Sequence, residues 1–157
     1  MAVVIREIVG FRQDEAGDWI ADLACLHRQH IRHQPPFSER PWVLDPAARA
    51  ARIGTGWDCP LCDRAELPEG LHLVRTAGPF DDVTLPPGLR ATHHVAAARW
   101  GRLRLLDGAV GFSMDTDPPI VRHMVAGDEQ PIPPEVPHRL TVDGPVRLVV
   151  EFFARDD

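Results

Sequence analysis

Apolar residues in this chain recur mostly at alternate positions, within short stretches that end in turn residues. This pattern is typical of β-strands. Residues 3–11 are mainly β-branched and apolar, and the turn-forming residues 14–18 follow them. If the next strand continues to residue 27, one of its faces carries Trp19, Ala21, Leu23, Cys25 and His27. These two stretches predict a β-hairpin near the N-terminus.

The clearest helical signal covers residues 45–54. Asp45 can cap the first free backbone amides, Pro46 suits the first helical position, and Gly54 suits the end of the helix. We therefore expect residues 1–64 to form a small α+β module built from one hairpin and one helix.

A polar, turn-rich junction at residues 64–70 precedes a succession of short apolar stretches. Strands at such spacing, joined by Gly and Pro turns, predict a sandwich or a small barrel. We expect this mainly β domain to span residues 67–157. Its predicted strands are residues 71–75, 102–106, 109–114, 120–125 and 146–153, with turns at residues 107–108, 115–119, 127–128 and 143–144.

All three cysteines lie in two short motifs with metal-ligand spacing. Cys25 and His27 form a Cys-x-His pair, and Cys59 and Cys62 form a Cys-x-x-Cys pair. Three thiolates and one imidazole are a common tetrahedral ligand set for structural zinc, so we predict a zinc site. The alternative is a pair of buried thiols with an unrelated third.

The fourth ligand of this site has more than one candidate. His30 and His33 follow His27 in the same stretch, and His30 could replace His27. A histidine-rich surface segment is the simpler interpretation of His30 and His33. A module of this size has a limited core, so a bound metal would supply much of its stability.

The composition excludes several classes of function. Hydrophobic residues make up 44% of the 157 residues, enough for a packed core, and the net charge of −6 argues against a general nucleic-acid binder. A local excess of arginine leaves a narrower hypothesis, in which the zinc module recognises nucleic acid or protein through Arg28, Arg32 and Arg40.

The sequence also carries information about cellular location. No apolar run approaches the ~20 residues of a membrane span, so no contact with a membrane is expected. The charge at Arg6 comes too early for a signal peptide, and three cysteines in metal-type spacing suit a reducing compartment. We expect a cytoplasmic protein.

Residues 127–138 resemble the second metal-binding motif of the cupins. Gly127, Pro133 and His138 match that motif, while Glu135 stands where the family often has glycine. The first cupin motif is weaker, because Gly101 falls roughly where its glutamate would be.

A narrower group resembles this part of the chain more closely, the cupin-like domain related to the N-terminal part of TehB-type tellurite-resistance proteins. In such domains a histidine lies seven positions before a Trp-Gly pair, which selects His93 over His94. The matching stretches are residues 80–89, 93–103, 136–140 and 149–153.

This resemblance implies a cupin barrel (a double-stranded β-helix or jelly roll) with a metal site and a link to tellurite or oxyanion stress. His93, His138 and Glu151 would be the ligands of a divalent zinc, iron, nickel or manganese ion. The alternative is that these three are polar residues of a barrel mouth that binds no metal. Methyl transfer is not implied, because the chain has no glycine-rich nucleotide-binding segment.

Residues 25–33, 35–36, 40–43 and 59–62, together with Gly54, resemble a small family of uncharacterised bacterial domains. Relatives tend to carry glycine between the first Cys and His, where this chain has Leu26. Leucine is tolerable there if the strand continues. The resemblance supports zinc but names no activity.

These observations predict a two-module metal-binding protein. The zinc module would be structural or an interaction surface, and the barrel would recognise a small, anionic molecule. A metal-dependent cupin oxygenase or isomerase using the same barrel residues is the enzyme alternative. Cupins often pair, so a homodimer is also expected.

Overall fold

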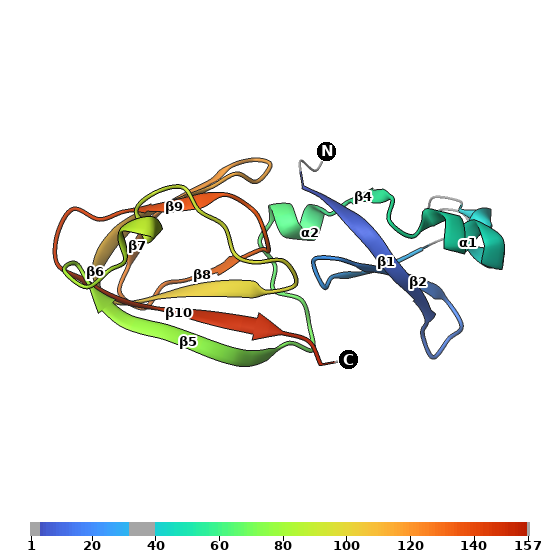
Figure 1. The fold of residues 1–157 in the computed structure, drawn as a ribbon, viewed down its shortest axis with the longest axis horizontal. Helices are drawn as coiled ribbons and strands as arrows, with labels where there is room; N and C mark the ends of the chain where they lie inside the picture. Colours follow the sequence, from blue (N-terminus) through green and yellow to red (C-terminus); the bar gives the residue numbers. More distant parts are fainter. Residues whose placement is uncertain (1–3, 32–39, 157) are drawn as a thin grey trace.

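The computed structural model describes residues 4–31 and 40–156. The chain forms two lobes side by side, each built on its own β-sheet (Figure 1). The first lobe holds a four-stranded sheet in the order β3-β2-β1-β4. The second holds a larger sheet in the order β5-β10-β6-β7, in which β8 and β9 also pair with β6. The division of the chain at residues 64–67 stays a prediction.

The first lobe follows the predicted hairpin-and-helix pattern. Asp45 accepts a hydrogen bond from the Ala48 amide, Pro46 opens the helix, and Gly54 follows its end with φ of 88°. The elements are β1 (Ile5–Gln13), β2 (Trp19–Leu23), β3 (Arg28–His30), a 3-10 helix η1 (Pro41–Leu44), α1 (Pro46–Arg52), β4 (Gly56–Asp58) and α2 (Pro60–Asp63).

The strand expected to run on to residue 27 ends earlier, at Leu23. The chain reverses there and returns as β3, so Cys25 and His27 lie in the connecting turn rather than on a strand face. The turn is closed by hydrogen bonds from the Leu23 amide to the His27 carbonyl (3.0 Å) and from the Leu26 amide to the Leu23 carbonyl (2.9 Å). The alternation argument for this ligand pair was therefore wrong.

The second lobe is organised around one long strand. β6 (Trp100–Met114) pairs with β10 and β8 along its first half and with β7 and β9 along its second half. The other elements are β5 (His72–Asp81), η2 (Pro87–Leu89), β7 (Ile120–Val125), β8 (Glu129–Ile132), β9 (His138–Thr141) and β10 (Val146–Ala154).

The predicted turn at residues 107–108 lies inside β6 instead, at the point where the pairing of this strand passes from β10 to β7. Gly108 has φ of 81°, and a Cβ there would collide with the Pro145 carbonyl oxygen. Glycine is thus required within the strand, because the backbone of Pro145 approaches it closely, and it does not end the strand.

Buried apolar residues join the two lobes. Trp100, fully buried at the start of β6, lies in one continuous core with Cys25, Cys59 and Cys62. The Asp63 carboxylate accepts a 2.8 Å hydrogen bond from the Asp117 amide of the barrel lobe. The described helices are all too short and too polar to cross a lipid bilayer.

Candidate metal centre and barrel cavity

Four buried side chains in the first lobe meet at one point. Cys25 and His27 come from the β2–β3 turn, and Cys59 and Cys62 come from the start of α2. Their ligand atoms all lie within 4.8 Å of one another. The sequence motifs thus converge in space.

The distances within this cluster fit a tetrahedral zinc ion. The Sγ atoms of Cys25 and Cys59 lie 3.8 Å apart, and His27 Nδ1 lies 3.3 to 3.6 Å from the three Sγ atoms. A tetrahedron with ordinary Zn–S and Zn–N bonds has S···S edges of about 3.8 Å and S···N edges of about 3.5 Å. The four side chains can therefore hold a metal such as zinc.

Leu26 explains how the first ligand pair is presented. Its φ of 74° lies in the left-handed region, which glycine adopts freely and leucine does not. A turn of this shape is where glycine would be favoured between the first Cys and His. The second pair is set by a tight turn, in which the Cys62 amide donates to the Cys59 carbonyl at 3.1 Å.

A backbone carbonyl fixes the orientation of the His27 ring. Nε2 lies 2.6 Å from the Glu66 oxygen, so Nε2–H donates there and Nδ1 faces the thiols as the free ligand atom. His30 lies elsewhere, 3.0 Å from the Asp14 carboxylate on the surface, and has no place in the cluster. His33 lies outside the described residues.

Without a cation, the clustered groups perturb one another strongly. Burial lowers the pKa of His27, but hydrogen bonds to Cys25 and Cys59 outweigh it and raise that pKa to about 9. Hydrogen bonds from Cys25 and Cys62 lower the pKa of Cys59, whereas Cys25 and Cys59 raise the pKa of Cys62. A divalent cation would relieve this competition for protons.

In the barrel, His93 and His138 lie together. Their backbones form a reciprocal bridge, with hydrogen bonds of 3.0 Å and 2.9 Å, and their ring centroids are 4.1 Å apart. Nδ1–H of His93 donates to the Ala91 carbonyl (2.9 Å), and that of His138 donates to the Val136 carbonyl (3.0 Å). In these tautomers both Nε2 atoms carry a lone pair. Burial lowers the pKa of His138 to about 4, so this ring is neutral at pH 7.

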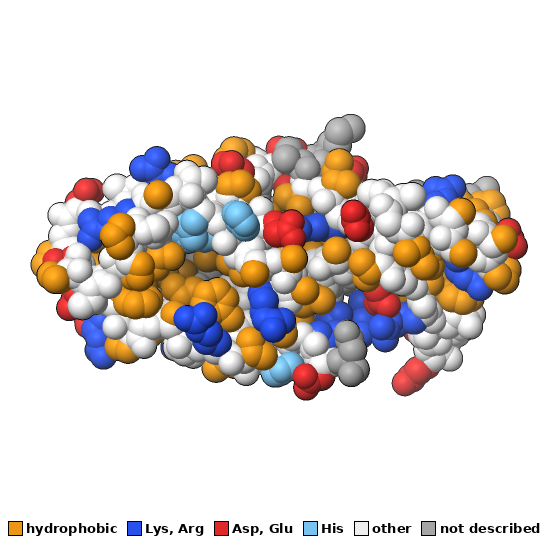
Figure 2. All heavy atoms as spheres, in the orientation of Figure 1, with side chains coloured by type: hydrophobic (Ala, Val, Ile, Leu, Met, Phe, Trp, Pro, Cys, Tyr) orange, Lys and Arg blue, Asp and Glu red, His pale blue; other side chains and the backbone are white. Residues whose placement is uncertain are grey.

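The two histidines border a cavity of about 280 Å³. Most of its wall is apolar, and Arg75 and His94 add polar groups. Figure 2 shows this region as a hollow in the barrel lobe, with hydrophobic side chains inside and histidines on one side. The apolar wall includes Phe80, Leu103, Phe112, Ile132, Val150 and Phe152.

Glu151, the expected third barrel ligand, is not part of this wall. Side chains alternate along β10, and because Val150 and Phe152 face the cavity, Glu151 faces the other side of the sheet. There its carboxylate pairs with Arg102 (2.9 Å) and Arg104 (3.6 Å). The expected set of two histidines and one carboxylate is therefore not assembled, and no carboxylate or thiol lines the cavity in the described part of the chain.

The sequence-based reasoning missed Arg75 and the aromatic wall of the cavity. Val150 and Phe152 flank the charged Glu151 in the sequence, and this local alternation carries the signal for that part of the wall. Arg102 and Arg104 alternate with leucines, which indicates one charged face of the sheet. An acidic side chain is expected to pair with them on that face.

The three arginines of the recognition hypothesis have separate surroundings. Arg28 pairs with Asp22 at 3.2 Å, and Arg40 stacks 4.3 Å from the centre of the Trp57 ring. Arg32 lies outside the described residues.

Two family models match this chain. Residues 9–66 match "Protein of unknown function (DUF3565)", and residues 75–150 match the TehB-like domain. Both resemblances inferred from the sequence are thereby confirmed. A search of curated proteins found no match.

Solved structures resemble the barrel lobe. A protein from E. coli strain K12 is 20% identical with a TM-score of 0.52, and the match covers 59% of this chain and 98% of that one. TehB from Haemophilus influenzae is 17% identical with a TM-score of 0.47, covering 55% of this chain and 32% of TehB. KdgF from Halomonas sp. is 14% identical with a TM-score of 0.36, covering 59% and 84%. The observed sheets confirm the mainly β fold, and the E. coli structure shares the fold of the part that it matches.

Proposed function

We propose that this protein binds a small molecule with an apolar body and an anionic end, in a cupin-like barrel attached to a zinc-held module. The cavity beside His93 and His138 is the observation that carries this proposal. A concave, mainly apolar pocket with a few polar groups is the usual form of a small-molecule site.

The polar groups of the cavity suit an anionic end. Arg75 supplies a permanent positive charge next to the Phe152 ring, whose centre lies 5.7 Å from its guanidinium carbon. The neutral His138 ring offers a hydrogen-bond acceptor and a metal ligand rather than a charge. A divalent ion held by His93 and His138 would need the ligand's own oxygens to complete its shell. Such an ion would bind weakly by itself.

The apolar wall favours an organic anion over a bare oxyanion such as tellurite. A small oxyanion would lose its hydration shell in this cavity and gain few polar partners in return. The link to tellurite or oxyanion stress would then act through an organic ligand. Because no carboxylate faces the two histidines among the described residues, nothing beyond a weak metal site favours the oxygenase or isomerase alternative.

For the zinc module we propose a structural role. Four protein ligands fill a tetrahedral shell and leave no open position for a substrate. Thiolate ligands also suit a reducing compartment, so we place the protein in the cytoplasm.

Calorimetry with simple probes tests the barrel proposal. Hexanoate has both features of the proposed ligand, hexanol lacks the charge, and acetate lacks the apolar body. We expect hexanoate to bind most tightly, and Arg75→Gln to weaken it about tenfold. Arg147→Gln, on exposed β10 surface outside the cavity, is the matched control.

A second variant tests the location of binding. Ala77→Phe places a ring in the cavity wall and should abolish hexanoate binding while the protein stays folded. If tellurite or acetate binds as tightly as hexanoate, or if Ala77→Phe binds hexanoate normally, the proposal is wrong.

A further inference from the structure

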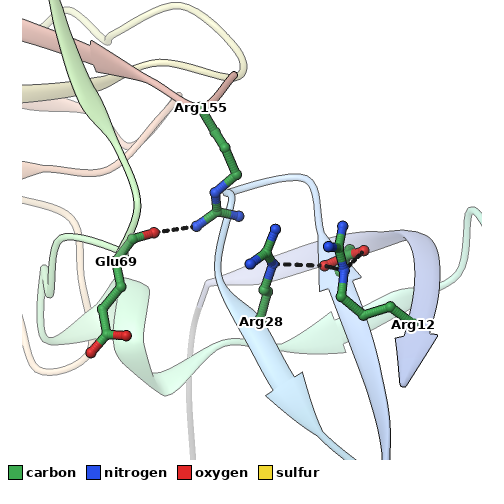
Figure 3. Close-up of polar contacts among 5 residues, drawn as sticks. Arg12, Arg28, Glu69 and Arg155 are labelled. Carbon is green, nitrogen blue, oxygen red and sulfur yellow. Dashed lines mark hydrogen bonds and ion pairs between the residues drawn. The ribbon is translucent and has the colours of Figure 1, made fainter. Parts of the chain in front are cut away.

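Three guanidinium groups meet in the cleft between the two lobes. Arg12 comes from β1, Arg28 from β3, and Arg155 from the residue that follows β10. All three line one hollow. Figure 3 shows them in a row with the Arg28 group in the middle, and Figure 2 shows basic side chains gathered between the lobes.

Each guanidinium in this row is held in place by the fold. The Asp22 carboxylate accepts hydrogen bonds from Nε of Arg12 at 2.9 Å and from Nε of Arg28 at 3.2 Å. Nη2 of Arg155 donates to the Glu69 carbonyl. For Arg12 and Arg28, the Nη groups donate to no residue in the described ranges, so their outer N–H donors remain for a ligand. Groups held this way lose little freedom when a ligand binds.

Basic residues outnumber acidic ones in the lining of this hollow. The lining includes Arg12, Arg28 and Arg155 against Asp22 and Asp156, and Asp22 is shared between Arg12 and Arg28. Asp156 pairs with His72 (3.4 Å), and Glu66 pairs with Arg64 (3.4 Å). Glu69 points its carboxylate away from the row (Figure 3). An anionic ligand would meet more guanidinium groups than carboxylates here, in a protein whose overall charge is −6.

The hollow continues past Arg28 and Arg155. Two adjoining hollows, of about 570 Å³ and 600 Å³, share Leu26, Arg28 and Arg155. The second has an apolar wall of Leu61, Leu67 and Pro131. The two hollows together are larger than an inorganic anion, and an apolar surface lies next to the charged groups.

We propose that this cleft binds a small phosphomonoester. Its phosphate would bridge Arg28 and the neighbouring guanidiniums, and its organic part would lie against Leu26 and Leu67. A phosphate has enough terminal oxygens to engage two guanidiniums at once, whereas one guanidinium fork already satisfies a carboxylate. This site is separate from the barrel cavity and does not depend on the function proposed for it.

Isothermal titration with phenyl phosphate tests the proposal on the full-length, zinc-replete protein. We expect binding that weakens as salt is raised, and inorganic phosphate to bind more weakly than phenyl phosphate. Arg28→Gln and Arg155→Gln should each weaken phenyl phosphate binding about tenfold, whereas Arg147→Gln should change it less than about twofold. Arg28 is half-exposed, so its variant should keep its fold, as its melting temperature would show.

The Arg75→Gln variant separates this cleft from the barrel. Phenyl phosphate affinity should be unchanged in Arg75→Gln, although hexanoate affinity falls there. Loss of phenyl phosphate binding in Arg75→Gln instead of Arg28→Gln would overturn the proposal. So would the absence of binding at about 10 mM phenyl phosphate, or tight binding of a single-stranded oligonucleotide by a protein that ignores phenyl phosphate.

Discussion

The indole Nε1–H of Trp100 donates a 2.7 Å hydrogen bond to the backbone carbonyl of Cys25. The same indole lies edge-to-face on the His27 ring, with centroids 5.2 Å apart and planes at 81°. The first residue of the central barrel strand is thus in direct contact with the turn that carries Cys25 and His27 of the candidate metal centre. The metal centre and the barrel are expected to be coupled in stability.

Replacing Trp100 with phenylalanine tests this coupling. The Cys25 carbonyl would lose its buried partner, and a smaller ring would leave a cavity in a fully buried position. We expect the free energy of unfolding to fall by about 2–4 kcal/mol, measured by urea denaturation. Trp57→Phe is the control, because Trp57 donates to Gln29 from a half-buried position and should cost about 1 kcal/mol. Equal losses in the two variants would contradict the coupling.

Glu151→Gln tests the placement of this carboxylate on the outer face of the sheet. Glutamine removes the negative charge that pairs with Arg102 and Arg104 in a buried position. The free energy of unfolding should therefore fall by about 1–2 kcal/mol. Metal content and hexanoate affinity should not change. In Glu129→Gln, where the carboxylate facing the same arginines is 45% exposed, the loss should be below about 0.5 kcal/mol. Loss of a barrel metal in Glu151→Gln would return Glu151 to the site.

The buried His138 ring predicts a pH dependence of stability. Its pKa falls from 6.5 to about 4 on folding, so between these values the unfolded chain binds a proton that the folded chain does not. The contribution of His138 to the free energy of unfolding is therefore complete above pH 6.5, and it declines as the pH falls toward 4. Complete loss amounts to about 3 kcal/mol.

Urea denaturation at pH 7 and at pH 4.5, on wild type and His138→Gln, measures this contribution. Carboxylates add their own pH dependence to both proteins, so the difference between the two isolates His138. Wild type should lose more stability than the variant. An identical loss in both would show that His138 is not held neutral by burial.

The Cys/His cluster was predictable because thiol chemistry restricts the candidate metal ligands to few residues. Cys25, Cys59 and Cys62 are the whole thiol content of the chain, and two of them lie in a Cys-x-x-Cys turn. How the first pair is presented was not predictable from alternation. The left-handed backbone of Leu26 depends on tertiary contacts that make leucine adopt a conformation it disfavours alone.

In the barrel, the strands were easier to predict than the side of the sheet that each residue faces. Residues 120–125 form the strand expected, but residues 102–106 and 109–114 belong to one strand that continues through Gly108. Glu151 was expected to face the cavity, but it lies on the other face of the sheet. Which side chains of β10 face the cavity depends on the register of β10 with β6, and the sequence of one strand does not reveal that register. The expected homodimer stays a prediction.

Elemental analysis of protein purified without chelator or histidine tag tests the central claim, that one zinc ion holds the N-terminal module. His27→Ala and His30→Ala should be measured beside wild type, because they remove neighbouring histidines with different surroundings. We predict about one zinc per chain at this centre in wild type and in His30→Ala, and its loss in His27→Ala. Wild type without zinc, or zinc lost in His30→Ala and kept in His27→Ala, would contradict the account.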